Sequence, residues 1–315
     1  MSTAVLKPHL SRSKQVDRLA ERGLQISDKA QALAALQRFG YYRLSGYFYP
    51  LRKTKPRGEL GRLDEFVDGA TFDLIVALAE FDKALRVHVM HAVETIEVAF
   101  RVAIAYKLGP LAPDAHLRPL LLDGRFTEKP SEERPSKHDE WIDRYKKLCK
   151  QSKEDFVKHH RDNYGGQMPI WVAIELWDFG LLSRFYEGLK PRDQGSIASA
   201  FGPVDGRMIA SWLRNISFVR NVVAHHGRLW NRTNPSTLVL PKGDRIPLLN
   251  GLGDGPRGKL YETLACMRFL LRTIQPHSEW HLYLKRQIDT FPASDLVSLE
   301  AAGFPKDWQT RPLWN

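Results

Sequence analysis

Apolar residues recur at intervals of three and four along most of this chain, a spacing typical of α-helices with one buried face. The longest pattern of this kind covers residues 72–108. Thr71 can cap its first turn, and Gly109 and Pro110 end it. The sequence therefore predicts one long helix with a buried face made of Phe72, Leu74, Ile75, Leu78, Phe81, Leu85, Val89, Val93, Ile96, Phe100 and Ile104.

Shorter patterns predict further helices on both sides of the long one. Ser11 or Ser13 can cap the first of them, and Asp28 can cap the second. Each of the others begins or ends near a Gly, a Pro or a polar residue. The predicted ranges are 12–22, 29–39, 138–160, 169–180, 181–189, 196–201, 206–224, 260–274 and 277–291.

Several stretches are not expected to be regular helix. Residues 39–47 are expected to turn into a basic loop at 52–62, and the Pro-rich stretch 110–137 is expected to be a loop or short insertion. We expect an all-α fold with a minor loop or short-strand insertion near 235–258. The possible short strands in it are 238–240 and 246–249.

The composition is that of a globular protein, with 43% hydrophobic and 26% charged residues among 315. The N-terminus lacks the apolar segment of a secretory signal, and no stretch reaches the roughly 18 apolar residues that span a bilayer. The two cysteines, Cys149 and Cys266, suggest neither a disulfide framework nor a zinc site. We therefore expect a cytoplasmic protein that is not attached to a membrane.

Positive charge is concentrated near the N-terminus. The net charge is +11, and residues 1–62 contain 13 Lys and Arg but four Asp and Glu. We expect three parts: a basic helical segment at 1–62, a helical core at 63–275 with an insertion at 110–137, and a C-terminal helix and tail at 276–315. Aromatic residues interleave with the N-terminal charge, as in proteins that bind RNA with exposed bases. The candidate RNA-binding residues here are Arg43, Arg52, Lys53, Lys55 and Arg57.

The run RNVVAHHGRLWNR at 220–232 carries the most specific candidate chemistry. Arg220 offers a permanent positive charge for phosphate oxygens, and His225 is of a residue type that titrates near neutrality. Asn221 shares a helix face with His225. In an ideal helix, however, Arg220 and His225 are about 140° apart, so they converge on one phosphate only if the helix ends or bends nearby. Gly227 is placed to end it.

Spacing alone is weak support, because Arg86 and His91 have the same separation. The context is more specific. RNxxAHH followed by GRLWNR resembles the Abi_2 family of abortive-infection proteins (AbiD/AbiF type) and the catalytic motif of the HEPN superfamily of helical RNA-acting domains. The resemblance extends from Lys7 to Trp314, and its other strings are FGYYRLSGY, FDKALR, IEVAFR, PIWVAIELWDFG and GFPKDW.

The resemblance implies a HEPN-like helical bundle with additional N-terminal helices, acting in anti-phage defence as a possible metal-independent endoribonuclease. In it, Arg220 would hold the scissile phosphate, His225 would transfer a proton, and Asn221 would orient the histidine or a phosphate oxygen. Two proton transfers are better served by two such sets, which HEPN enzymes obtain by pairing two domains, so the resemblance implies a homodimer with RNA as its partner. The groove beside the site would be lined by Arg228, Trp230 and Arg232.

The sequence leaves alternatives open. His226 could be an auxiliary group, Arg86 and His91 could form a second motif, and Trp230 could pack in the core. Arg220 and His225 could be a helix-end pair without chemistry, in a protein that only holds a small non-coding RNA. A toxin controlled by an antitoxin partner is a further alternative.

Two other pairings bear on the chemistry. Glu97 and Arg101 have the spacing of an intrahelical ion pair. The histidine pairs at 159–160 and 225–226 could contribute to a metal site, but they lack the three- or four-residue spacing of helical zinc ligands. We therefore expect neither a metal nor a cofactor.

Overall fold

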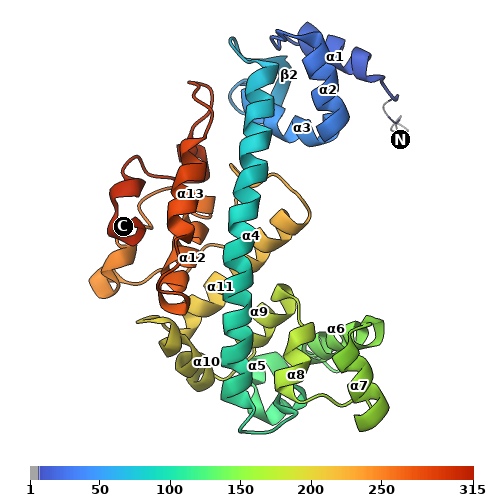
Figure 1. The fold of residues 1–315 in the computed structure, drawn as a ribbon, viewed down its shortest axis with the longest axis vertical. Coiled ribbons are helices and arrows are strands. Elements are labelled where there is room, and N and C mark those ends of the chain that lie inside the picture. Colours follow the sequence, from blue (N-terminus) through green and yellow to red (C-terminus); the bar gives the residue numbers. More distant parts are fainter. Residues whose placement is uncertain (1–5, 7) are drawn as a thin grey trace.

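The computed structural model describes residue 6 and residues 8–315, and one helix runs through its whole length (Figure 1). This helix, α4 (Phe72–Leu108), has 37 residues, which corresponds to about 55 Å at 1.5 Å per residue. The Thr71 hydroxyl accepts a hydrogen bond from the Leu74 amide at 3.1 Å, so the predicted cap and both predicted ends are confirmed. The predicted 1–62 segment includes residues 1–5 and 7, which lie outside the described residues.

The N-terminal helices pack around the first part of α4. They are α1 (Arg12–Glu21), α2 (Lys29–Phe39) and α3 (Tyr41–Phe48). Ser11 and Asp28 cap the first two as predicted. The turn expected at 39–47 is wrong, because Gly40 at φ +80° ends α2 and α3 begins directly after it.

The expected basic loop at 52–62 contains a strand at each end. Strands β1 (Arg52–Thr54) and β2 (Arg62–Phe66) pair antiparallel. The hairpin is also attached to the N-terminal helices: Phe66 is buried, and its amide donates to the Arg22 carbonyl, just after α1, at 2.8 Å. The basic segment between the strands is therefore held on a short two-stranded ribbon.

A second group of helices surrounds the far end of α4. The group comprises α5 (Gly124–Thr127), α6 (Lys137–Gln151), α7 (Asp155–Tyr164), α8 (Ile170–Ala173) and α9 (Phe179–Glu187). The single helix expected at 138–160 is divided in two by an extended Ser152. The helix expected at 169–180 also ends early, because the Asp178 carboxylate caps α9 and places Gly180 inside that helix.

The remaining helices are α10 (Pro191–Ala198), α11 (Gly206–Ala224), α12 (Leu260–Ile274) and α13 (Trp280–Asp289). The predicted ends of α11 and α12 are confirmed. The strands considered within 235–258 are wrong: among the described residues this stretch has only short 3-10 turns. Val239 bonds to α11 instead, since its amide donates to Ser211 Oγ and its carbonyl accepts from Trp212 Nε1, both at 2.9 Å.

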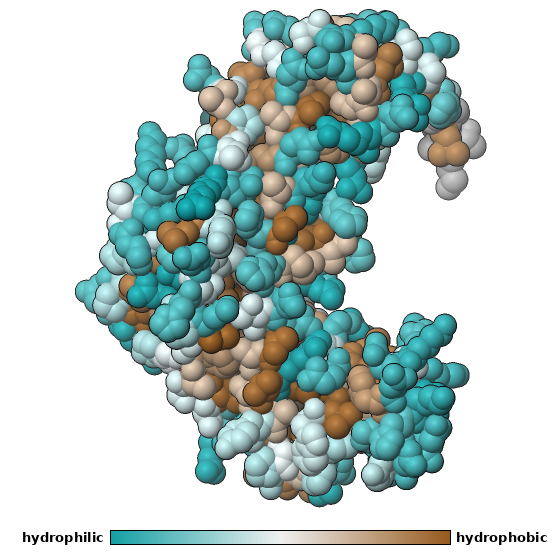
Figure 2. Space-filling model, in the orientation of Figure 1, coloured by the Kyte–Doolittle hydropathy of each residue, from teal (hydrophilic) through white to brown (hydrophobic). Residues whose placement is uncertain are grey.

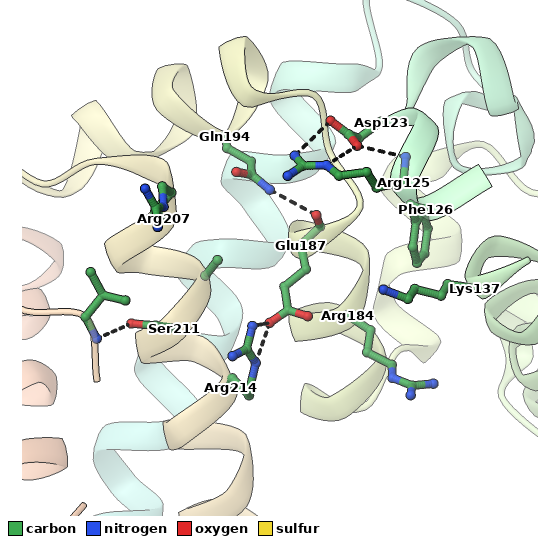
Figure 3. Close-up of a pocket in the computed structure, with 12 residues that line it drawn as sticks. Asp123, Arg125, Phe126, Lys137, Arg184, Glu187, Gln194, Arg207, Ser211 and Arg214 are labelled. Atoms are coloured by element: carbon green, nitrogen blue, oxygen red, sulfur yellow. Dashed lines mark hydrogen bonds and ion pairs between the residues drawn. The ribbon is translucent and has the colours of Figure 1, made fainter. Parts of the chain in front are cut away.

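The structure is mostly helical, which confirms the predicted fold class. Figure 2 shows a deep hollow on one side, between the α1–α3 group and the α6–α8 group. Helices α9, α10 and α11, with residues from the start of α5 and α6, also line a pocket of about 490 Å³ (Figure 3). In the described part of the chain, no helix is long and apolar enough to cross a membrane.

Candidate functional site

Helix α11 ends in a turn closed by backbone hydrogen bonds. The His226 amide donates to the Val223 carbonyl at 2.9 Å, and the Gly227 amide donates to the Val222 carbonyl at 2.8 Å. This is the pattern of a Schellman cap, which needs a left-handed residue just past the helix. His226 takes that role at φ +55°, and no other non-glycine residue in the described chain has a positive φ.

Gly227 contributes to this turn differently from the prediction. The sequence places Gly227 to end the helix, but the left-handed residue of the cap is His226, and the φ of Gly227 is not positive. A Cβ on Gly227 would lie 3.2 Å from the Val222 carbonyl oxygen and from a methyl group of the same residue. Glycine is therefore favoured here because the backbone returns close to the last turn of α11.

Arg220 and Asn221 lie in the last turns of α11, and His225 is its C-cap residue. Arg220 Nη1 donates to Asn221 Oδ1 at 3.3 Å. The His225 amide still donates to the Asn221 carbonyl at 3.0 Å, so the helical hydrogen bonding reaches His225, although its own φ and ψ of −89° and 12° are no longer helical. Asn221 and His225 are exposed and share a face, while Arg220 is half-buried. The Arg220 guanidinium thus contacts Asn221, which shares a helix face with His225, although the Cα of Arg220 lies on another side of the helix.

An ion-pair cluster on α4 lies close to Arg220. Arg101 Nη2 donates to Glu97 Oε1 at 2.5 Å, which confirms the predicted intrahelical pair. The same nitrogen donates to the Trp177 carbonyl at 2.6 Å. Burial raises the pKa of Glu97, and the positive charges of Arg101 and Arg220 oppose that rise. Arg220 therefore faces a partly buried carboxyl group on one side and the exposed end of α11 on the other.

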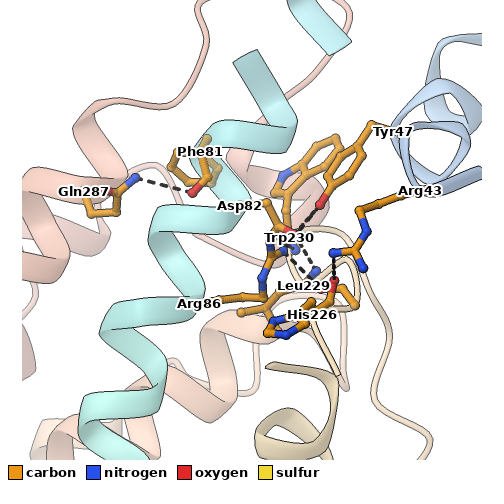
Figure 4. A network of polar contacts seen from close by, with 10 residues as sticks. Arg43, Tyr47, Phe81, Asp82, Arg86, His226, Leu229, Trp230 and Gln287 are labelled. Atoms are coloured by element: carbon orange, nitrogen blue, oxygen red, sulfur yellow. Dashed lines mark hydrogen bonds and ion pairs between the residues drawn. The ribbon is translucent and has the colours of Figure 1, made fainter. Parts of the chain in front are cut away.

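A fully buried carboxylate holds the segment that follows the motif (Figure 4). Asp82 on α4 is 0% exposed and accepts from Tyr47 Oη at 2.7 Å and from Arg86 Nη1 at 2.7 Å. It also accepts from the backbone amides of Leu229 at 2.9 Å and Trp230 at 2.7 Å. Burial raises the pKa of the Asp82 carboxyl, and these donors oppose the rise. One side chain thus joins α3, α4 and the segment after α11.

Arginines reinforce this junction through backbone carbonyls. Arg86 Nη1 donates to the Gly227 carbonyl at 3.1 Å, and Arg43 Nη1 donates to the His226 carbonyl at 3.2 Å. Arg228 donates to the Gly46 carbonyl in α3. Burial lowers the pKa of Arg228. The guanidinium groups of Arg43, Arg86 and Arg228 therefore fix the turn in place from three sides.

These contacts change the expected roles of several residues. Trp230 is 1% exposed, and its Nε1 donates to the Ser298 carbonyl at 3.2 Å. Trp230 therefore packs in the core, as the alternative interpretation expected, and does not offer a surface on which a base could stack. Arg228 is committed to a backbone carbonyl in the same way. Arg86 is also a structural residue, which leaves no free arginine for a second motif with His91.

The other predicted RNA-binding residues are spread over two places. Arg232 is exposed near the end of α11, with its guanidinium 5.4 Å from the Phe218 ring centroid. In the hairpin, Arg52 pairs with Asp64 at 3.3 Å and Lys55 pairs with Glu59 at 3.4 Å. Within residues 8–315, Lys53 and Arg57 form no ion pair, and both are exposed.

The histidines considered for a metal are divided between α7 and the end of α11. His160 Nδ1 is 2.8 Å from the Phe156 carbonyl oxygen, and His159 Nδ1 is 3.2 Å from Asn163 Nδ2. Across the residues that the structure describes, no group of three or more His, Cys, Asp or Glu is placed to hold a metal ion.

Comparison with known families identifies the chain. Residues 34–231 match the family of Abi-like proteins. The chain belongs to this family. The matched range begins in α2 and ends just after the buried junction, so it includes the Asp82 contacts and the whole Arg220–His226 segment. No curated protein and no solved structure matches the chain. Membership of the Abi-like family suggests a role in abortive-infection defence.

Sequence reasoning did not assign a role to Tyr47 or Asp82. Both belong to strings that resemble the family, FGYYRLSGY and FDKALR. The available signal was an acidic residue at Asp82 between two apolar residues of a buried helix face, four positions before an arginine. That pattern predicts a buried ion pair, but it does not predict the distant backbone amides that complete it.

We expect Asp82→Asn to destabilise the protein by about 3–5 kcal/mol, because it removes the charge that pairs with Arg86 and turns an N–H group toward other donors. Chemical denaturation measures this change. Glu94→Gln on the exposed face of α4 is the control and should change stability by less than about 0.5 kcal/mol. Equal stability of the two variants would contradict the role of Asp82.

We expect His226→Gly to stabilise the protein by about 1 kcal/mol, because glycine adopts the left-handed conformation without the Cβ contact. His226→Ala should give no such gain, since alanine keeps the strained Cβ and lacks only the imidazole. Thermal and denaturant unfolding of both variants test the point. A gain of the same size in both would show that the imidazole, not the backbone, is the source.

Proposed function

We propose that the protein is an RNA endonuclease of abortive-infection defence that works without a metal, through Arg220, Asn221 and His225. The observation that carries the proposal is the contact from Arg220 Nη1 to Asn221 Oδ1, on the face that also presents the exposed His225. It combines a fixed cation, an orienting amide and an accessible imidazole within about one and a half helical turns. His226 is one residue further on and is also exposed, and it would serve as an auxiliary group.

In the proposed reaction, the RNA 2′-OH attacks the neighbouring phosphorus, and the bond to the leaving 5′-oxygen breaks. A base accepts the hydroxyl proton, and an acid protonates the leaving oxygen. Arg220 stabilises the negative charge that develops on the phosphate. The products are a 2′,3′-cyclic phosphate and a 5′-hydroxyl end.

One chain supplies His225 once for these two proton transfers, and a homodimer supplies it twice. An apolar groove of about 460 Å³ on α4 supports this part of the proposal. Val98, Val102 and Tyr106 recur every four residues on α4 and are 51%, 61% and 85% exposed. Arg101 also lines the groove and pairs with Glu97 beside Arg220. A second copy seated there would lie beside the Arg101–Glu97 pair whose electrostatics include Arg220.

Exposed cations supply the expected contacts to flanking RNA. Arg43 and Arg232 both lie beside the turn that ends α11 and both are exposed, although one nitrogen of Arg43 is already used by the His226 carbonyl. Lys53 and Arg57 extend the basic surface along the hairpin. Phosphate contacts of this type position an RNA strand without reading its sequence.

We expect Arg220→Ala and His225→Ala each to lower RNA cleavage at least about 100-fold, the usual size of a lost acid–base or charge-stabilising group. Folding should persist, because His225 is exposed and, within the described chain, the Arg220 side chain forms a hydrogen bond only with its neighbour Asn221. Gel assays of RNA cleavage, with end-group analysis, measure the effect. His91→Ala, an exposed histidine on α4, is the control.

Wild-type rates in both site variants would overturn the catalytic assignment. Cleavage that stops in the presence of a chelator would overturn the metal-independent mechanism. Stable RNA binding by the wild-type protein, with the RNA intact after long incubation, would favour the non-catalytic alternative.

We expect Val102→Glu to weaken self-association at least about tenfold, because the docked copy would bury an unpaired carboxylate. Sedimentation velocity over a concentration series measures the effect, and cleavage should fall with the dimer. Leu120→Glu is the matched control, since Leu120 is 87% exposed and lies outside the groove. Unchanged association of Val102→Glu would show that the second copy does not bind there.

A further inference from the structure

The pocket of about 490 Å³ beside α11 is not explained by the proposed nuclease site (Figure 3). Its walls come from the start of α5, the first residue of α6, and from α9, α10 and α11. Its volume is in the range of pockets that hold small ligands. The side chains around it carry five positive and two negative charges: Arg125, Lys137, Arg184, Arg207 and Arg214 against Asp123 and Glu187.

The cations of this pocket are unequally neutralised. Arg125 Nε pairs with Asp123 at 2.9 Å, and Arg214 Nε donates to Glu187 Oε1 at 2.6 Å. In the described chain, Lys137 and Arg207 have no ion pair, and both are exposed to solvent. The pocket therefore presents unbalanced positive charge around a concave surface.

The inner wall is pre-formed by hydrogen bonds that do not involve the cations. Ser211 Oγ donates to the Met208 carbonyl at 3.0 Å and accepts from the Val239 amide at 2.9 Å. Gln194 Nε2 donates to the Tyr186 carbonyl at 2.9 Å. Ala210 and Phe126 add apolar surface to the same wall. A ligand would therefore meet a fixed, partly apolar wall beneath a rim of cations.

We propose that this pocket binds a nucleotide, with its phosphates at Lys137, Arg207 and Arg214 and its base against the wall formed by Ala210 and Val239. Guanidinium groups bind phosphate oxygens through paired hydrogen bonds, whereas lysine contributes a point charge. A base offers the flat, mostly apolar surface that the inner wall can cover. The Glu187 carboxylate holds Arg214 in the free protein and competes with the phosphate for it.

The nucleotide pocket and the nuclease site lie at different positions along α11, and none of Arg220, Asn221 and His225 lines the pocket. Arg207 and Arg214 are seven residues apart and share a face of α11. Asn221 and His225 continue that face seven and eleven residues beyond Arg214, which places them about 10 and 16 Å further along the helix, and Arg220 is turned about 120° from it. The proposal therefore does not rest on the proposed nuclease, and Arg220→Ala should bind nucleotide as the wild-type protein does.

The test is isothermal titration calorimetry of the full chain with ATP, pyrophosphate, adenosine and a short oligoribonucleotide, each titrated separately. We expect saturable binding of ATP at one site per chain, weaker binding of pyrophosphate and none of adenosine. The double variant Lys137→Gln/Arg207→Gln should bind ATP at least about tenfold more weakly. Lys150→Gln/Lys158→Gln removes the same charge from exposed positions outside the pocket and should bind like the wild type.

A second variant is expected to raise the affinity for ATP instead of lowering it. Glu187→Gln removes the charge that holds Arg214, so we expect ATP to bind about threefold more tightly. No ATP binding at millimolar concentration, or equal weakening by both double variants, would overturn the proposal. Binding of the oligoribonucleotide alone, lost in Lys137→Gln/Arg207→Gln, would also overturn it and assign the pocket to RNA phosphates.

Discussion

The buried Asp82 carboxylate is the contact on which the candidate site depends. A charge removed from water is stable only when donors surround it, and Asp82 has four: a phenol, a guanidinium and two backbone amides. These donors come from α3, from α4 and from the segment after α11. Losing any one of these segments would leave the carboxylate unsatisfied, so the three are stabilised together.

This junction also explains how a histidine can hold a left-handed conformation. His226 would ordinarily be disfavoured at φ +55°, and such conformations persist where the surroundings fix them. Here Arg43 donates to the His226 carbonyl, and Arg86 donates to the Gly227 carbonyl. Asp82 accepts from the backbone amides of Leu229 and Trp230, which follow shortly after. The strained turn is therefore a consequence of the buried network, and it presents two adjacent imidazoles to solvent at the end of α11.

Local patterns predicted the parts of this architecture that depend on local interactions. The ends of α4, α11 and α12 follow from caps and apolar spacing, and the structure confirms them. The errors occurred where distant contacts decide the outcome. Val239 has strand-like neighbours but bonds to α11, and Trp230 resembles a nucleic-acid contact but is enclosed beside Phe291. For the candidate site, the sequence identified Arg220, Asn221 and His225 as one unit but could not show that Arg220 reaches Asn221.

The distribution of arginine contacts limits what the net charge of +11 can indicate about an anionic partner. Arg86, Arg101 and Arg228 donate to carbonyls and carboxylates inside the protein, so their charge is already matched or half-buried. Exposed cations that form no ion pair within residues 8–315 lie in several places, which include the hairpin, the pocket beside α11 at the opposite end of α4, and the lysines on and between α6 and α7. An extended polyanion and a small phosphorylated ligand would therefore meet different groups of cations, which the sequence alone could not separate.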